Sequence, residues 1–272
     1  MNLVNLYRCK FKKSHSVILS YCLRGYLFPY CIMYIANPFP TSEVLWGSAP
    51  IDWCEANFVQ NVAGFKIAEI NNTITNAAYI LAAIALLKNS KLQHFSSNEG
   101  RIFLLYCVAL LLTGLTSCWF HATLIWIAQK ADEIFENCTV MVIFHGTFTN
   151  LSSKDLLRRV YVHAVLVSLC IILIPVAFCE VHLIIISFTT VYRFSQGKLE
   201  LREQTHLGKT AVYAAVGFAC WLLDFFACST FSAYYLHAFG WHCLTGMALY
   251  EAGLLLHAKL LIRAETDGKR QQ

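Results

Sequence analysis

The chain has 272 residues, of which 57% are hydrophobic and only 14% are charged. Soluble domains carry about 25% charged residues, so this composition excludes an ordinary soluble protein and indicates an integral membrane protein. The net charge of +5 at pH 7 does not indicate nucleic-acid binding, because the basic residues are scattered among short connecting segments.

The first 45 residues are expected to form an N-terminal extension. Four basic residues between positions 8 and 13 precede the apolar stretch SVILSYCLRGYLFPYCIMYIA. This pattern is typical of a signal peptide, a signal anchor or an additional membrane span. Arg24 interrupts the stretch and no clean small-residue cleavage site follows, so we favour an additional hydrophobic helix.

Seven apolar stretches follow residue 70, and each approaches the roughly 20 residues that a membrane helix needs. They lack the period-two alternation of membrane strands. We therefore predict an all-α fold, a polytopic membrane protein with a seven-transmembrane helix bundle. The bundle would occupy residues 46–264 and precede a short tail, 265–272. The stretches lie near residues 72–88, 103–127, 132–150, 158–178, 180–194, 210–230 and 238–262.

The connections between these stretches alternate in charge. The first, third and fifth connections and the tail are rich in Lys and Arg, whereas the second carries only Lys130 and the fourth and sixth carry neither residue. By the positive-inside rule, the basic connections and the C-terminus face the cytosol. The segment 40–70 is then expected on the luminal or exterior side.

Polar residues of three predicted spans gather at the luminal side. His121 and Ser117 lie near the end of the second span, Asp132 opens the third, and His237 and His242 open the seventh. Three histidines with one open position for water form a catalytic zinc arrangement. In such a site Asp132 would accept the proton of the water, and Ser117, one turn from His121, would donate to an oxyanion.

Packing is the alternative for any histidine near the end of a span, and on spacing alone both interpretations stay open for these three. His163, His182 and His257 are expected to be packing or interfacial residues. The twelve cysteines include no CxxC motif, and most are expected to be small buried hydrophobes. Cys54 and Cys228 both lie on the predicted luminal side, where a disulfide between them is expected.

A second polar cluster lies just before the first span. Asp52, Glu55, Asn57 and Glu69 offer the hard oxygen ligands that calcium prefers, but their spacing is not that of an EF-hand. From spacing alone, a solvated acidic loop is the favoured interpretation.

Four segments together resemble the alkaline ceramidases, seven-span hydrolases of the superfamily that includes the adiponectin receptors. They are WGSAPIDWCEANF, AEINNTITNAAYI, GLTSCWFHATL with DE eleven residues after its histidine, and LHAFGWHCLTG. The resemblance covers residues 46–262. It implies hydrolysis of ceramide, a partner drawn from the membrane lipids, to a sphingoid base and a fatty acid. It also implies an endoplasmic reticulum or Golgi membrane, with the metal-site end luminal and the C-terminus cytosolic.

The resemblance also implies a site residue by residue. The implied zinc ligands are His121, His237 and His242, and the implied catalytic residues are Ser117 and Asp132. The implied calcium ligands are Asp52, the carbonyl of Trp53, Glu55, Asn57 and Glu69.

This sequence departs from the family pattern in the spacing of its last two histidines. The family has HxxxH, but Gly240 makes the motif HxxxxH here. Residues five apart diverge by about 140° around an ideal α-helix, against about 40° for four apart. For both rings to reach one metal, either His237 precedes the first helical turn or Gly240 allows a π-bulge.

Three other functional classes stay open. A receptor or sensor of the adiponectin-receptor type would use the same metal core, and lipid product release would distinguish it from a ceramidase. A transporter or channel would predict inverted repeats or broken helices, which the sequence lacks. A family member that is inactive because Gly240 misplaces a histidine is the third.

Overall fold

We describe a computed structural model of the chain. It describes residues 49, 53–62, 64–90, 97–146, 152–173, 177–196 and 199–270. The predicted N-terminal helix and Asp52 lie outside these described residues.

A two-stranded antiparallel hairpin precedes the helices. Its strands are β1 (Gln60–Val62) and β2 (Phe65–Ile67), and Gly64 adopts the positive φ of 88° that the tight connection requires. The remaining elements are helical: α4 (Ile70–Thr75), α5 (Ala77–Asn89), α6 (Asn98–Thr123), α7 (Trp126–Gly146), α8 (Ser153–Leu173), α9 (Ala177–Ser195), α10 (Leu201–Phe226), α11 (Cys228–Phe231), η2 (Ser232–Tyr234), η3 (Leu236–His242) and α12 (Cys243–Arg270).

The all-α class is confirmed, and each of the seven predicted apolar stretches overlaps a helix. Among the described residues, four segments are long and apolar enough to cross a membrane: Ile70–Asn89, Asn98–Thr123, Lys154–Leu173 and Leu201–Phe226.

Most of the predicted borders differ from the observed helix ends by several residues. The second stretch was expected to continue to residue 127, but α6 ends at Thr123 because Leu124 takes a left-handed conformation with φ of 50°. The last stretch was expected to end near residue 262, but α12 continues to Arg270.

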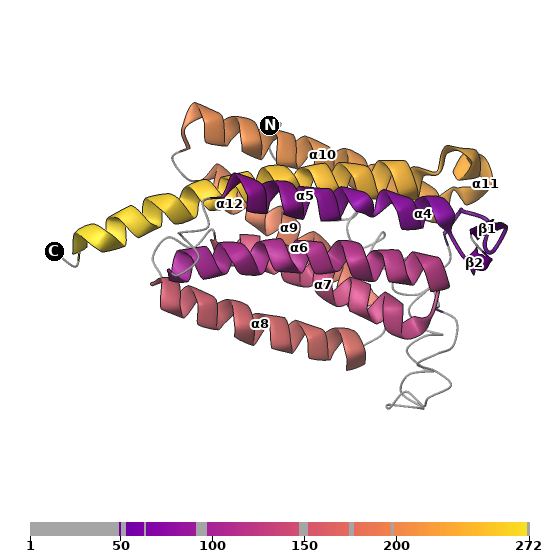
Figure 1. The fold of residues 1–272 in the computed structure, drawn as a ribbon. Coiled ribbons are helices and arrows are strands. Elements are labelled where there is room, and N and C mark those ends of the chain that lie inside the picture. Colours follow the sequence, from indigo (N-terminus) through magenta and orange to yellow (C-terminus); the bar gives the residue numbers. More distant parts are fainter. Residues whose placement is uncertain are drawn as a thin grey trace, which may run out of the picture.

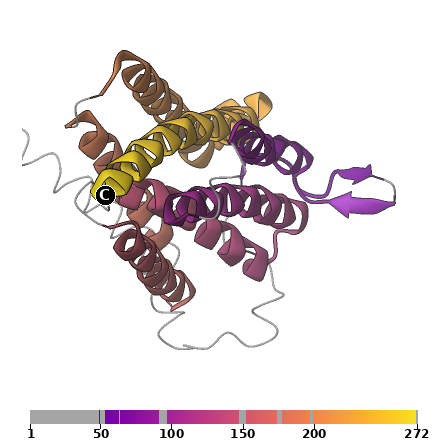
Figure 2. The same ribbon diagram turned by 60° about the vertical axis from the view of Figure 1, so that its left-hand side comes forward.

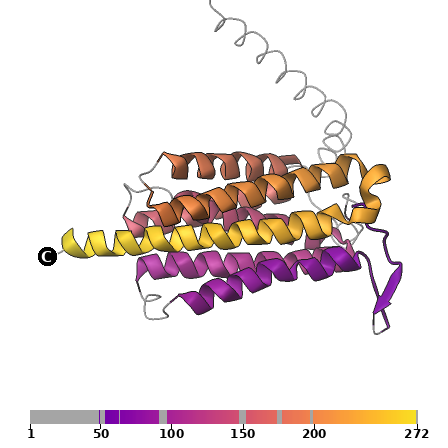
Figure 3. The same cartoon turned by 90° about the horizontal axis from the view of Figure 1, so that it is seen from above.

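The long helices lie along a common direction and form one bundle (Figure 1). Helix α6 packs between α5 and α7, and α12 packs against both α5 and α10. The views in Figures 2 and 3 show the hairpin and α11 at one end of this bundle, with the C-terminus at the other. We call the first of these the hairpin end.

Glycines allow the helices near the hairpin end to approach closely. A Cβ atom on Gly114 of α6 would lie 2.7 Å from Cγ1 of Ile80 and 3.1 Å from the backbone nitrogen of Ile80. A Cβ atom on Gly246 of α12 would lie 2.9 Å from the Cβ atom of Ala78. Both α6 and α12 therefore contact the α4–α5 segment directly, and this places the site residues that they carry close together.

The outer faces of the bundle are apolar. Phe188 of α9, Val165 of α8 and Val212 of α10 are 69%, 58% and 59% exposed, respectively. Exposed apolar side chains over several helices are costly in water but favourable in a bilayer.

Histidines of three helices form one hydrogen-bonded chain, which the packing interpretation of His163 and His182 did not anticipate. Nε2 of His145 lies 3.0 Å from Nδ1 of His163, and Nε2 of His163 lies 3.3 Å from Nε2 of His182. Nδ1 of His182 lies 2.6 Å from the side-chain oxygen of Asn137. The chain links α7, α8 and α9, so these histidines connect helices in addition to filling space.

Candidate metal centre and cavity

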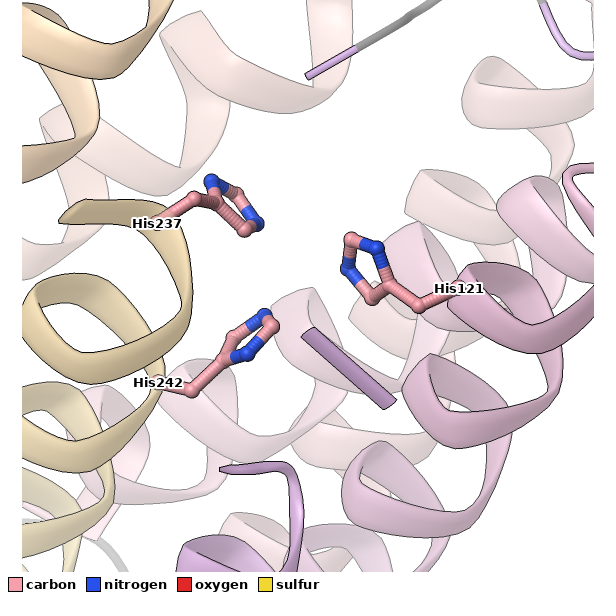
Figure 4. Close-up of side chains that lie close together, drawn as sticks. All are labelled: His121, His237 and His242. Carbon is pink, nitrogen blue, oxygen red and sulfur yellow. The ribbon is translucent and has the colours of Figure 1, made fainter. Parts of the chain in front are cut away.

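Three buried histidines converge at the hairpin end of the bundle. His121 comes from the last turn of α6, and His237 and His242 come from η3, so the rings approach from two sides (Figure 4). One ring nitrogen of each lies within 4.8 Å of the others. Three nitrogens arranged tetrahedrally at about 2.1 Å from one zinc ion are about 3.4 Å apart. The rings would therefore have to close together by roughly 1 Å to hold a single zinc ion.

The five-residue spacing of the histidine pair is accommodated by a π-helix. Segment η3 spans LHAFGWH, Leu236–His242. A π-helix bonds residue i to residue i+5, which places His242 over His237 on one face. Of the two expected solutions, the structure contains the π-segment. A Cβ atom on Gly240 would overlap Cβ and Sγ of Cys220 in α10. The φ of Gly240 is not positive, so the backbone conformation does not require glycine here. Glycine is required because a side chain would prevent η3 from lying close to α10.

Two of the three rings are oriented by hydrogen bonds at Nδ1. The carboxylate of Glu69 lies 2.5 Å from Nδ1 of His121, and the hydroxyl of Thr75 lies 2.9 Å from Nδ1 of His242. The Thr75 hydroxyl donates to the backbone oxygen of Asn71, so it can accept from the ring. Metal-bound histidines usually donate their second nitrogen in this way, and here the arrangement leaves Nε2 of both rings for a metal.

His237 is held through its ring face and its backbone. Its ring stacks on Trp53 with centroids 3.8 Å apart. Its backbone N–H donates to one oxygen of Asp224 at 3.2 Å, and the backbone N–H of Cys54 donates to the other oxygen at 3.1 Å. A disulfide joins Cys54 to Cys228, with Cα atoms 5.2 Å apart. The segment before the hairpin is thereby fixed against α10 and η3.

Ser117 and Asp132 meet beside the triad. Both are buried, and their side chains are hydrogen-bonded to each other. Ser117 lies one turn before His121 on α6, and Asp132 faces the same cavity as His121 from α7. The structure thus brings the expected serine, aspartate and histidines to one place.

The residues expected to bind calcium are only partly assembled within the described chain. The carboxylate of Glu55 accepts hydrogen bonds from the backbone N–H groups of Asn71 and Asn72 at 2.7 and 2.8 Å. The side-chain amide of Asn72 donates to Glu69 at 3.1 Å. Glu55 and Glu69 therefore lie on two sides of Asn72, at the first turn of α4.

The other members of that set differ in their surroundings. Asn57 is exposed, and the ring of Trp53 lies on the histidine side. A cavity of about 80 Å³ adjoins Glu55 and Asn71. The carboxylates and this cavity provide hard oxygen atoms and space, which suit calcium but do not identify it.

A larger cavity of about 280 Å³ begins at the triad and continues between the helices. Its apolar wall comes mainly from α9 and α10, and it includes Leu183, Ile184 and Phe218. Its polar wall comes from α7. Long apolar walls beside a polar end suit a lipid with a polar head.

Sequence reasoning missed several residues of this site. Thr75 and Asp224 orient the histidine segments, but each is far in sequence from the histidine it contacts. Gln129, Glu133 and Glu136 line the cavity with Asp132. Their spacing of i, i+4 and i+7 on one helix face was a signal that could have identified this wall.

Comparisons with known proteins identify the family of this chain. A family model described as Ceramidase matches residues 46–272. The chain belongs to the ceramidase family. An alkaline ceramidase of Drosophila melanogaster is 28% identical over 240 residues, which cover 80% of each chain. An alkaline ceramidase of Saccharomyces cerevisiae is 27% identical over 78% of each chain, and the human alkaline ceramidase 1 is 25% identical over 82% of this chain and 86% of its own length.

The contact between Thr75 and His242 leads to a prediction. In Thr75→Val the ring loses its acceptor at Nδ1, so we expect the affinity for Zn²⁺ to fall by about 10-fold or more. Competition between the purified protein and a zinc chelator measures this. The matched control is Thr123→Val, whose hydroxyl is exposed and bonds only its own helix at Trp119. Equal affinities of the two variants would contradict the orienting role of Thr75.

Proposed function

We propose that this ceramidase-family protein is a zinc-dependent ceramidase, which hydrolyses the amide bond of ceramide to a sphingoid base and a fatty acid within the membrane. The observation that carries the proposal is the convergence of three buried histidines at one end of a cavity with apolar walls. Family membership and the names of the relatives support the same reaction.

We further propose that seven helical segments cross the membrane: α4–α5, α6, α7, α8, α9, α10 and η3–α12. The acidic residues that make α7 more polar line the cavity, so they need not contact lipid. The basic connections would place the hairpin end in the lumen and the C-terminus in the cytosol of an endoplasmic reticulum or Golgi membrane.

His121, His237 and His242 would hold the zinc ion. When bound, zinc supplies a Lewis acid that activates water near neutral pH and polarises an amide carbonyl. The Nδ1 partners of two of these rings orient the imidazoles and leave Nε2 of each for the metal.

Asp132 would transfer protons during the reaction, and Ser117 would donate a hydrogen bond to the developing oxyanion. The Asp132 carboxylate takes a proton from the attacking water, and its new O–H can donate to the oxygen of Ser117. The Ser117 hydroxyl is then free to donate to the developing oxyanion. Asp132 finally delivers its proton to the leaving nitrogen, which departs as the amine. The hydrogen bond between these side chains supports this division of roles.

Calcium is proposed as a structural ion bound by Asp52, the Trp53 carbonyl, Glu55, Asn57 and Glu69. The position of Glu69 between His121 and Asn72 offers a direct route from such a site to the zinc ligand. An ion there would stabilise the segment that fixes His237 and would affect the metal centre without contacting substrate.

Replacing a proposed zinc ligand tests the function. His121→Ala should lose stoichiometric zinc and at least about 10²-fold in the rate of hydrolysis, because a metal stabilises transition-state charge by several kcal/mol. Fatty acid release from a ceramide and metal analysis of the same preparation measure both. His257→Ala, which removes a histidine beside Phe103 outside the triad, is the control. Full turnover in His121→Ala would end the zinc assignment, and a zinc-bearing wild type without hydrolysis would favour the receptor class.

The proton role of Asp132 is tested separately. Asp132→Asn keeps the shape of the side chain but removes the basic oxygen, so kcat should fall by about 10²- to 10⁴-fold while bound zinc remains stoichiometric. The exposed Asp155→Asn is the control and should retain wild-type turnover. Loss of zinc from the Asp132→Asn variant in proportion to its loss of activity would point to a structural role instead.

Calcium binding is tested through stability. Adding calcium to dialysed protein should raise the thermal midpoint, since a ligand at 100 times its Kd stabilises the folded state by about 2.7 kcal/mol. Glu55→Gln should reduce this shift, whereas Glu99→Gln, at the start of α6, should preserve it. No calcium-dependent shift in the wild-type protein would rule the ion out.

A further inference from the structure

One face of α7 presents a row of acidic and amide groups to the cavity. Gln129, Asp132, Glu133 and Glu136 are spaced i, i+3, i+4 and i+7, so they lie on one side of the helix. Glu180 of α9 lines the same cavity. We call these five residues the acidic wall. Among the described residues that line the cavity there is no lysine or arginine.

Within the described chain, Glu133 is the carboxylate of the acidic wall whose negative charge is balanced by a neighbouring lysine. Nζ of Lys130 lies 2.6 Å from one of its oxygens, and the side-chain amide of Gln129 donates to the other at 2.6 Å. The hydrogen bond from Gln129 to Glu133 also fixes the Gln129 side chain. Its amide nitrogen is engaged with Glu133, so its amide oxygen remains available to a ligand. The positive charge of Lys130 is thereby balanced by Glu133 within this local group.

Three buried atoms of the acidic wall have no hydrogen-bond partner among the described residues. They are Oε1 of Gln129, Oδ1 of Asp132 and Oε2 of Glu180. Gln129 is 1% exposed and Asp132 is 7% exposed. The Gln129 atom is always an acceptor, and so are the other two when their carboxyl groups are ionised. A buried acceptor without a donor is unfavourable, so a fitting ligand would donate several hydrogen bonds.

The charge of the acidic wall restricts the ligand further. When they are ionised, Asp132, Glu136 and Glu180 place negative charge in a cavity of low polarity, where a cation is attracted more strongly than in water. A primary ammonium group has one positive charge and three N–H donors, which match three orphaned acceptors. The apolar wall formed by α9 and α10 can take an alkyl chain attached to that group.

We propose that the acidic wall is a binding subsite for a long-chain primary amine in its cationic form. The origin of such an amine rests on the proposed function, since amide hydrolysis converts an uncharged lipid into an amine and a fatty acid. The subsite then favours the amine product over the uncharged substrate and repels the fatty carboxylate. The amine is therefore the product that dissociates last, and it inhibits hydrolysis more strongly than the fatty acid does.

Direct binding tests this subsite without reference to turnover. The probe is dodecylamine carrying a fluorophore on its terminal carbon, bound to the full-length protein in detergent and competed by unlabelled dodecylamine or dodecanol. Wild-type protein should prefer the amine over the alcohol by at least 10-fold. The double variant Glu136→Gln, Glu180→Gln should bind the amine at least 10-fold more weakly and the alcohol within 2-fold of wild type. Partition into micelles is the same for every variant and cancels in this comparison.

Glu99→Gln is the matched control, because it removes a carboxylate at the start of α6, outside the cavity lining. It should bind both probes as the wild type does. A wild-type protein that binds amine and alcohol equally, or a double variant that keeps the preference for the amine, would overturn the subsite. An amine preference in a protein that does not hydrolyse ceramide would leave the subsite standing and refute only the proposed function.

Discussion

The rest of this site depends on one constraint: three buried imidazole rings must face one point inside the bundle. Buried polar groups are stable only when they are hydrogen-bonded, so each ring or its backbone needs its own partner. Glu69 serves His121, Thr75 serves His242, and Asp224 binds the backbone of His237. These partners come from two segments, since Glu69 and Thr75 flank and end α4 and Asp224 lies in α10. The constraint therefore extends from the rings to the packing of α4, α6, α10 and η3.

The segment before the first long helix is part of this packing. The backbone N–H of Glu69 donates to the carbonyl of His121 at 2.9 Å, and that of Ala68 donates to Ala122 at 3.0 Å. Glu69 is thus tied to the end of α6 through both its backbone and its carboxylate. Earlier in the chain, Cys54 is tied to α10 through Asp224 and the disulfide. A disturbance in this segment would reach two of the three histidines without contacting the cavity.

Much of this could be predicted from the sequence, because hydropathy and charge patterns are local properties. The helical stretches and the gathering of polar residues at one end follow from them. The approach of His121 to His242 was expected from the family resemblance instead. Other features depend on packing between distant segments. Whether HxxxxH could align its rings was decided by a π-segment that fits only because Gly240 lies against Cys220. The partners Thr75 and Asp224 carry no local signature either. The acidic wall had such a signature on α7, but its acidic residues were not considered as one helix face.

Two parts of the cavity lining, the histidine triad and the acidic wall, differ in chemical character. This difference affects which molecules the site accepts and which it releases. The triad offers uncharged nitrogen ligands, which neither attract nor repel an uncharged lipid through net charge. The acidic wall offers acceptors and, when its carboxyl groups are ionised, negative charge, which would stabilise the cationic amine that forms only after the amide bond is broken. Coulomb attraction is weak in water but strong where the dielectric constant is low, so burial increases this distinction between substrate and product. The triad and the acidic wall both lie inside one bundle whose outer surface is apolar. Lipid solvates that surface, and the helices alone must satisfy the polar groups within.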